Sequence, residues 1–251
     1  MGKRVLITGA GSGFGRGAAF ALAERGHEVI ATTESDEQAT ALRAEAPGLR
    51  VERVDITDPD DVERVLDWAV DVLVNNAGMG RTGPMADVPM DLMRRIFDVN
   101  VFGTLAVSQA VIPGMAARGG GRIIIVSSIA GVAVAPTFGP YAMTKHALEA
   151  MGKAMRAELV PLGIDVTLLN PGPYQTGFND RMADSMWEWF GDSSVSAPAT
   201  DVFRMIGEFI TAGQMDPAEV VAAMVDLVEA DTTTENNFVP PEIVDQLPGR
   251  S

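Results

Sequence analysis

The sequence predicts an α/β protein in which helices flank a doubly wound, parallel, seven-stranded sheet. Short apolar runs rich in Val and Ile alternate with helical patterns, and several of these runs end in glycine or polar side chains. This rhythm is typical of right-handed βαβ units, whose strands end at one edge of a shared sheet. Because neither an internal repeat nor a long linker divides the chain, we expect residues 1–251 to form a single domain.

Composition narrows the range of functions. The chain has 47% hydrophobic and 21% charged residues, as soluble globular proteins do, and its formal net charge of −15 argues against binding to nucleic acid or an anionic membrane surface. It contains no cysteine and only two histidines, so we expect no disulfide, no thiol nucleophile and no metal site. We see no signal-peptide pattern and no membrane-spanning apolar run, and therefore expect a cytoplasmic protein.

A glycine-rich turn follows the first predicted strand. Val5–Ile7 is a compact apolar strand, Thr8–Gly15 is the turn, and a helical pattern runs from Arg16 to Arg25. Such a turn lets a pyrophosphate approach the backbone and the positive end of the next helix, although it can also simply join a strand to a helix. Gly13–Ala18 fits the pattern G-x-G-x-x-A, but we prefer T-G-x-x-x-G-x-G because it begins where the strand ends.

An acidic residue follows the second predicted strand. This strand, Glu28–Thr32, ends at Thr33 and Glu34, and Glu34 lies nineteen residues after Gly15. A carboxylate at this position can accept hydrogen bonds from the adenosine ribose and would repel a 2′-phosphate, so it favours NAD over NADP. The alternative interpretation is a solvated glutamate at a strand end.

The elements that follow continue the alternation of strands and helices. Thr57 or Asp58 can cap a short helix, and the strand after that helix ends in the polar run Asn75–Gly78. The predicted ranges are a helix over Glu37–Ala46, a strand over Leu49–Val54, a helix from Pro59 to about Trp68, and a strand over Val70–Val74.

A long helix is predicted from Asp91 to about Arg118. It contains Asn100 and Gly103, and an asparagine inside a helix needs a reason because it disfavours the helix slightly. Hydrogen bonding of its side chain to backbone groups is the simplest explanation.

A tyrosine and a lysine follow the next strand at helical spacing. Ile123–Val126 reads as a buried strand closed by Ser127 and Ser128, and the pattern is helical from Gly139 onward. Tyr141 and Lys145 therefore share one helix face. Because a neighbouring ammonium favours a phenolate, the pair can donate and accept a proton near neutral pH. The alternative interpretation is that the two polar residues only share a solvent-exposed helix face, where they favour solubility.

The last part of the chain adds an apolar segment to the sheet. Residues 174–215 combine Met, Trp and Phe side chains with a loose connection at Asp192–Ala199, which predicts short helices that form a mobile cover over the site. An extra packed helical layer is the alternative. The remaining predictions are a strand over Ile164–Leu169 ending in Asn170–Pro173, a helix over Pro217–Glu229, and a strand over Asn237–Val239, with Pro240 and Pro241 in an edge position or a tail.

Taken together, these motifs resemble the short-chain dehydrogenase/reductase family, which has a Rossmann fold, over almost the whole chain. The wording of the helices looks most like the branch near the hydroxysteroid and retinol dehydrogenases. The motifs, in order, are Thr8-Gly9-x3-Gly13-x-Gly15, Asp55, Asn75-Asn76-Ala77-Gly78, Asn100, Ser128, Tyr141-x3-Lys145 and Pro171-Gly172-x3-Thr176.

The resemblance implies catalytic roles for four residues. Tyr141 would exchange a proton with the substrate oxygen, and Lys145 would lower the pKa of Tyr141 and hold the nicotinamide ribose. Ser128 would hydrogen-bond the reacting oxygen, and its spacing to Tyr141 favours it over Ser127. Asn100 would support a water-linked proton path from Lys145.

The resemblance also implies a cofactor site for NAD, with NADP possible. Thr33 stands where NAD users of the family often have Asp, and Ser12 is not the basic residue found in many NADP users. Asp55 would meet adenine, the glycines would hold the pyrophosphate, and Pro171, Gly172 and Thr176 would border the nicotinamide. The full implied set is Gly9, Ser12, Gly13, Phe14, Gly15, Thr33, Glu34, Asp55, Ile56, Asn76, Ala77, Gly78, Tyr141, Lys145, Pro171, Gly172 and Thr176.

We therefore expect an NAD(P)-dependent alcohol dehydrogenase or carbonyl reductase. The apolar cover favours a hydrophobic or aromatic secondary alcohol or ketone as substrate. An epimerase or dehydratase of the same fold, or a nicotinamide-sensing protein without chemistry, is the alternative. The family usually forms dimers or tetramers through its long helices, here those containing Asn100 and Lys145, and the sequence leaves the number and the exact substrate open.

Overall fold

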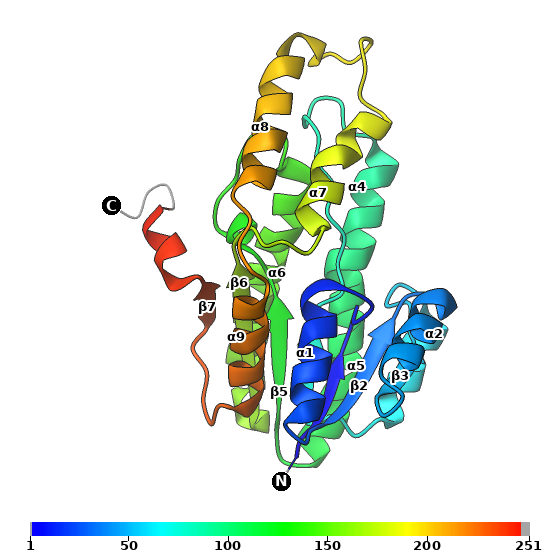
Figure 1. The fold of residues 1–251 in the computed structure, drawn as a ribbon. Coiled ribbons are helices and arrows are strands. Elements are labelled where there is room, and N and C mark those ends of the chain that lie inside the picture. The colour runs from blue at the N-terminus through cyan, green and yellow to red at the C-terminus, as the bar shows by residue number, and fades with distance from the viewer. Residues whose placement is uncertain (1, 247–251) are drawn as a thin grey trace.

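The computed structural model describes residues 2–246 and forms one α/β domain around a parallel sheet (Figure 1). The strand order is β3-β2-β1-β4-β5-β6-β7, and every neighbouring pair is parallel. This order confirms the predicted doubly wound sheet. The strands are β1 (Arg4–Ile7), β2 (Glu28–Thr33), β3 (Arg50–Arg53), β4 (Val72–Asn75), β5 (Gly121–Val126), β6 (Ile164–Pro171) and β7 (Asn236–Val239).

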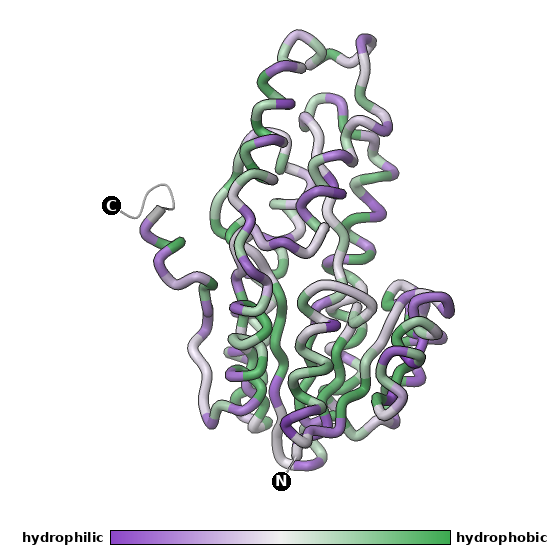
Figure 2. The backbone as a smooth tube through the Cα atoms, viewed as in Figure 1, coloured by the Kyte–Doolittle hydropathy of each residue, from purple (hydrophilic) through white to green (hydrophobic). Residues whose placement is uncertain are grey.

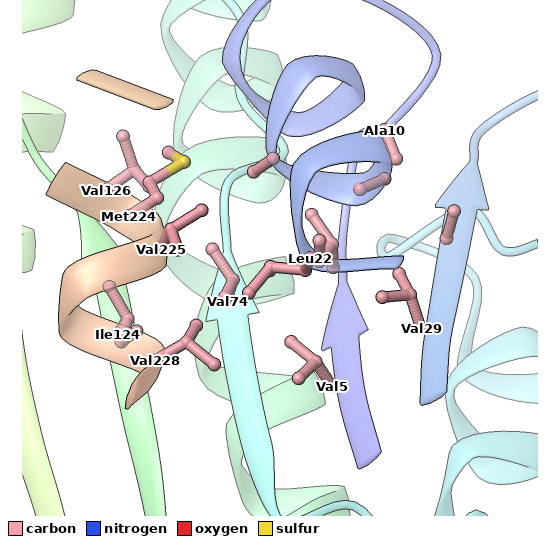
Figure 3. Close-up of a cluster of buried hydrophobic side chains, with 14 of the residues drawn as sticks. Val5, Ala10, Leu22, Val29, Val74, Ile124, Val126, Met224, Val225 and Val228 are labelled. Carbon is pink, nitrogen blue, oxygen red and sulfur yellow. The ribbon is translucent and has the colours of Figure 1, made fainter. Parts of the chain in front are cut away.

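Successive side chains of a strand point to opposite faces of the sheet. Because consecutive residues of the central strands are apolar, both faces of the sheet are apolar there. In β1, Val5 and Ile7 join one core and Leu6 joins the other, and in β5 Ile124 and Ile125 divide in the same way. Figure 3 shows the first of these cores, where the sheet meets α1 and α9. Burial on both faces explains why the central strands β1, β4 and β5 read as largely apolar runs.

Helices cover the two faces in separate layers (Figure 1). The first core contains side chains of α1, α2 and α9, and the second contains side chains of α5 and α6. Their bounds are α1 (Gly13–Glu24), α2 (Asp36–Glu45), α5 (Thr104–Ala117), α6 (Gly139–Leu159) and α9 (Ala218–Glu229). α1 begins three residues earlier than predicted, inside the glycine-rich turn, which brings its N-terminus to the strand ends.

The short helix after β3 is as predicted in place but differs in type. It consists of α3 (Pro59–Glu63) followed by the 3₁₀ turn η1 (Arg64–Asp67). Of the two possible caps, Asp58 is the one used, since its carboxylate accepts a hydrogen bond of 3.0 Å from the Asp60 N–H.

The long helix predicted over Asp91–Arg118 is interrupted, and the prediction of one regular helix was wrong there. α4 (Met90–Phe97) passes into a π-helical turn, η2 (Asp98–Gly103), before α5 begins. Gly103 lets this turn pack closely on Ile56, because a Cβ at that position would lie 2.8 Å from Ile56 Cγ1. The π turn carries Asn100, and such turns occur frequently at functional sites.

The combined run Met90–Ala117 is long and apolar enough to cross a membrane by length and composition alone. Half of its apolar window is buried in the fold, which is the behaviour of a core helix packed on a sheet.

Residues 174–215 rise above the carboxyl ends of the strands, where Figure 1 shows α7 (Phe178–Asp184) and α8 (Thr200–Ala212). The two ends of this segment are held together, since the Gln175 N–H donates to Met215 O at 2.9 Å and the Met215 N–H donates to Pro173 O at 3.0 Å. Its first part, α7 with the 3₁₀ turn η5 (Ser185–Glu188), buries Met182 and Met186.

α8 packs differently from α7. None of its residues is buried, and Met205 and Phe209 are 63% and 81% exposed. Figure 2 shows the alternation of apolar and polar residues along α8, in contrast to the mostly apolar central strands. The 3₁₀ turn η6 (Ala197–Ala199) precedes α8, and η7 (Pro241–Gln246) follows β7 at the other end of the fold.

Candidate active site

A cavity of about 1900 Å³ opens at the carboxyl ends of the central strands. Open parallel sheets bind ligands at this edge, beside the point where the strand order reverses. Most residues of the predicted site meet in this one cavity. Those that line it are Gly9, Ser12, Gly13, Phe14, Glu34, Asp55, Ile56, Asn76, Ala77, Gly78, Ser128, Tyr141, Lys145, Pro171, Gly172 and Thr176.

Thr33, Gly15 and Asn100 were predicted site residues that do not line the cavity. Thr33 is fully buried, and its hydroxyl donates to Ser35 O at 3.1 Å, so its side chain does not face the cavity; its contact with the cofactor stays a prediction. Gly15 acts through the shape of the turn, since a Cβ there would lie 2.4 Å from Asn76 Nδ2 and 2.8 Å from Gly9 O.

The glycine-rich turn fits a pyrophosphate. α1 begins at Gly13, has no side-chain cap and has no acidic residue in its first turn. Its first N–H groups and the positive end of its dipole are therefore available to an anion on the cavity side. Thr176 closes the turn from above, because a Cβ on Gly13 would lie 3.4 Å from its Cβ.

The polar run after β4 is joined to this turn by hydrogen bonds. The Asn76 amide donates to Thr8 O and to Gly9 O, each at 3.0 Å, and the Ala77 N–H donates to Thr8 Oγ1 at 3.0 Å. Gly9 has a positive φ of 65° and packs against Ala77, where a Cβ would lie 2.7 Å from the Ala77 Cα. The two loops therefore form one rigid wall of the cavity.

Two carboxylates, those of Glu34 and Asp55, line the cavity together with the glycine-rich turn. Glu34 is exposed there, and Asp55 accepts hydrogen bonds from the Thr57 N–H at 2.9 Å and the Thr57 hydroxyl at 2.7 Å. Partial burial raises the pKa of Asp55, but these two bonds and the charges of Arg95 and Arg53 outweigh it, so the pKa lies below its usual value. Asp55 is thus an ionised acceptor at neutral pH.

Tyr141 lies in the wall opposite the glycine turn, near the N-terminus of α6. Its ring is buried and packs 5.7 Å from the ring of Phe178, between ring centres. The Ser128 hydroxyl hydrogen-bonds to the phenol and also accepts from the Ala130 N–H at 3.1 Å. Ser127 Oγ is buried and has no hydrogen-bond partner within the described residues. This geometry favours Ser128 over Ser127 as the serine that acts with Tyr141.

Asn100 contacts α6 without reaching the cavity. Its side-chain amide donates to Met79 O at 2.9 Å and to Thr144 Oγ1 at 3.0 Å, and its side-chain oxygen accepts from the Met79 N–H at 2.8 Å. Thr144 Oγ1 in turn donates to Tyr141 O at 2.7 Å. Asn100 therefore ties the loop after β4 to α6. The water-linked proton path stays a prediction.

Sequence reasoning missed part of the cavity wall. Tyr174 is buried, its hydroxyl donates to Glu219 at 2.8 Å and its ring packs against Phe14, while Ile243 lies so close to Gly172 that a Cβ there would be 2.6 Å from it. Tyr174 was not singled out in the sequence, and nothing there indicated that the chain after β7 returns to the site.

The sequence was compared with families of known function. The family described as short chain dehydrogenase matches residues 3–187. The chain belongs to this family. The protein is therefore an oxidoreductase. The match confirms the resemblance to the short-chain dehydrogenases that we inferred from the motifs.

Curated relatives of this short-chain dehydrogenase lie in the expected branch. It is 39% identical over 213 residues to the uncharacterized oxidoreductase YusZ of Bacillus subtilis, covering 80% of this chain and 73% of the relative. It is 33% identical over 244 residues to human retinol dehydrogenase 8, covering 91% and 78%. It is 35% identical over 195 residues to human 17-beta-hydroxysteroid dehydrogenase type 1, covering 72% and 60%.

Solved structures share the fold. A short-chain dehydrogenase from Streptomyces avermitilis has a TM-score of 0.81 and 30% identity, covering 95% of this chain and 88% of the other. One from Burkholderia cenocepacia, in complex with NADP, has a TM-score of 0.76 and 27% identity, covering 99% and 94%. One from Burkholderia phymatum, in complex with NAD, has a TM-score of 0.81 and 24% identity, covering 98% and 91%. Family and neighbours support the prediction of a nicotinamide cofactor.

Burial governs the charges of Tyr141 and Lys145 in this dehydrogenase. It raises the pKa of Tyr141, and the hydrogen bond to Ser128 opposes this only in part. Lys145 donates from Nζ to Val126 O at 2.8 Å, and Nζ lies 5.5 Å from the centre of the Tyr141 ring. Desolvation of the phenolate thus raises the Tyr141 pKa, where the sequence led us to expect a lowered one. Tyr141 is a protonated phenol at neutral pH.

The same burial lowers the pKa of Lys145 to about 8, although the charge of Glu149 raises it in part. Because the pKa in the folded state lies below the ordinary value of 10.5, the buried ammonium destabilises the fold below about pH 8. This penalty disappears as the pH rises from about 8 towards 10.5.

We therefore expect wild type to gain stability relative to Lys145→Met by about 3 kcal/mol over that pH interval. Denaturant unfolding of both proteins from pH 7 to 10.5, in steps of half a unit, measures the difference. A difference that stays constant, or that falls as the pH rises, contradicts the assignment of Lys145 as a buried, destabilised ammonium.

Proposed function

We propose that this short-chain dehydrogenase transfers a hydride between NAD(P) and a secondary alcohol or ketone. The observation that carries the proposal is that Ser128, Tyr141 and Lys145 line the same cavity as the glycine-rich turn. A protein that only senses nicotinamide needs no acid–base group beside its ligand. The reaction also needs both a cofactor site and a proton donor within one enclosure, and this cavity supplies both.

The proton is assigned to Tyr141. A protonated phenol next to the reacting carbonyl donates its proton to the oxygen as the carbon is reduced, and accepts it back in the oxidation. The Ser128 hydroxyl, which hydrogen-bonds the phenol, is placed to bind the same oxygen. The charge that develops on that oxygen in the transition state then meets two hydroxyl groups, those of Tyr141 and Ser128.

Bound nicotinamide supplies or takes up the hydride. The residues of the chain would hold it by backbone N–H groups of α1 at the pyrophosphate, by Asp55 at adenine, and by Lys145 at the ribose of the nicotinamide. Glu34 would accept hydrogen bonds from the ribose of the adenosine and repel a 2′-phosphate, so we propose NAD as the preferred cofactor.

The substrate side of the cavity carries apolar side chains next to charged ones such as Arg181 and Asp184. Phe178, Met182, Met205, Ile206 and Phe209 all line it, and they come from the covering segment 174–215. We propose a hydrophobic or aromatic substrate, held under this cover. α8 with its exposed Met205 and Phe209 is the part with apolar surface still to bury, so it is the part that closes.

The remaining predictions concern assembly and location. A homodimer or homotetramer through the long helices is supported by exposed apolar side chains on them, Phe102 near the start of α5 and Met143 on α6, which are 58% and 45% exposed. A cytoplasmic location stays a prediction.

Glu34→Gln tests the cofactor assignment. Removing the negative charge beside the adenosine ribose should lower the preference for NAD over NADP by about tenfold, since the repulsion of a 2′-phosphate is lost. Dissociation constants of NADH and NADPH, measured by nicotinamide fluorescence, give the ratio. Glu37→Gln, the same change at an exposed position of α2, should leave the ratio as in wild type. Wild type binding NADPH as tightly as NADH contradicts the assignment.

Tyr141→Phe tests the reaction. A panel of apolar ketones and secondary alcohols, with small sugars for comparison, is first followed by nicotinamide absorbance with wild type, and we expect the apolar compounds to react faster. The variant should then lose at least about a hundredfold in kcat with the best substrate and still bind NADH with the affinity of wild type. Turnover retained in the variant contradicts the role of Tyr141. Turnover with no net change in nicotinamide absorbance would indicate an epimerase or dehydratase instead.

A further inference from the structure

A buried carboxylate lies behind the catalytic residues. Glu149 is one helical turn beyond Lys145 on α6, and only 5% of its surface is exposed. A buried ionised group needs charged partners or hydrogen bonds, because its desolvation costs several kcal/mol. The reaction proposed above does not use Glu149, so its place in the interior requires another explanation.

Amide groups from two neighbouring strands hold this carboxylate. The Asn170 side chain on β6 donates to one oxygen at 2.6 Å, and the Asn236 side chain on β7 donates to the other at 2.7 Å. Asn236 also donates to the Asn170 side-chain oxygen at 3.0 Å. The three side chains form a closed set of hydrogen bonds that joins α6 to the edge of the sheet.

The network continues to the catalytic serine. The Asn170 amide also donates to the backbone oxygen of Ser128 at 3.3 Å. Glu149 itself packs against the turn that follows Ser128, since a Cβ on Gly131 would lie 3.0 Å from Glu149 Cγ and 2.8 Å from Ser127 Oγ. The position of the Ser128 backbone is therefore fixed from behind by Glu149 and Asn170.

Charged groups on every side of Glu149 define its electrostatic role. Along α6, Lys145 precedes it by one turn and Lys153 follows by one turn, with Lys153 Nζ at 3.9 Å from Glu149 and at 3.9 Å from Glu235, next to β7. β6 contributes the neutral Asn170. Lys153 is exposed to solvent, so its charge is screened, whereas Lys145 is buried.

We propose that Glu149 is a positioning residue that serves both members of the catalytic set. Its carboxylate holds Asn170, and through it the backbone of Ser128, while its negative charge balances the buried ammonium of Lys145. It touches neither the cavity nor a ligand. Its effect on turnover rests on the proposed function, but its effects on Lys145 and on the Ser128 turn can be measured without turnover.

The electrostatic effect is measured through stability. Unfolding free energies of wild type, Glu149→Gln and Glu158→Gln are determined from pH 6 to 10.5, each with and without Lys145→Met. For each protein, the difference in unfolding free energy between the forms with and without Lys145→Met, followed across pH, isolates the titration of Lys145. In Glu149→Gln this titration should move down by about one pH unit, because the burial of the ammonium is no longer opposed by the carboxylate. Glu158 is an exposed residue of the same helix, and its substitution should leave the titration in place.

The structural effect is measured by amide hydrogen exchange of the same proteins. In Glu149→Gln the peptide that covers Ser127–Gly131 should exchange at least about tenfold faster than in Glu158→Gln, because the network behind it is broken. An unshifted Lys145 titration in Glu149→Gln, an equal shift in Glu158→Gln, or unchanged exchange at the turn overturns the proposal.

Glu149→Asp is the second variant, for use where Glu149→Gln does not fold. It keeps the charge but shortens the reach to Asn170 and Asn236. It should keep the Lys145 titration of wild type and still show faster exchange at Ser127–Gly131. A Lys145 titration lowered as far as predicted for the glutamine variant, or protection equal to wild type, overturns the proposal. Because no readout uses an alcohol or ketone, loss of the proposed reaction would not affect either result.

Discussion

Parallel pairing of β1, β4, β5 and β6 is the constraint on which the site depends. Their register brings the glycine turn, the Asn75–Gly78 run, the two serines and the Asn170–Pro173 turn to one edge of the sheet. Each loop supplies one function, and hydrogen bonds between loops fix their spacing, as in the bonds of Asn76 to Thr8 and Gly9. Both faces of every central strand are buried in the two apolar cores. This packing fixes the strands, and with them the loops at this edge.

Desolvation sets the protonation of the catalytic pair. Enclosure of Tyr141 and Lys145 disfavours the charge on both, so the pair rests as a phenol beside an ammonium of lowered pKa. A protonated phenol can donate its proton to a carbonyl oxygen. The buried ammonium of Lys145 needs a negative charge nearby to stabilise it. We propose that Glu149, one turn further along the same helix, supplies that charge.

The sequence predicted most of the architecture because the signals were local. Strand runs, the glycine turn and the spacing of Tyr141 and Lys145 depend on neighbouring residues, and the structure brings these features together as expected. Three features depended on tertiary contacts and were not visible. Thr33 faces the interior because of its strand register. The π turn packs on Ile56 at Gly103, which has no side chain to prevent the contact. The chain after β7 brings Ile243 back to the cavity. The sign of the Tyr141 pKa shift also required burial, which spacing alone does not give.

The central claim is that hydride and proton are exchanged inside this one cavity. Reduction of an apolar ketone by NADH carrying deuterium at the transferable position of C4, followed by mass spectrometry of the alcohol, measures this most directly. We expect one deuterium on the carbon that bears the hydroxyl, and none lost to water. Alcohol without deuterium, or deuterium recovered in solvent, would contradict it.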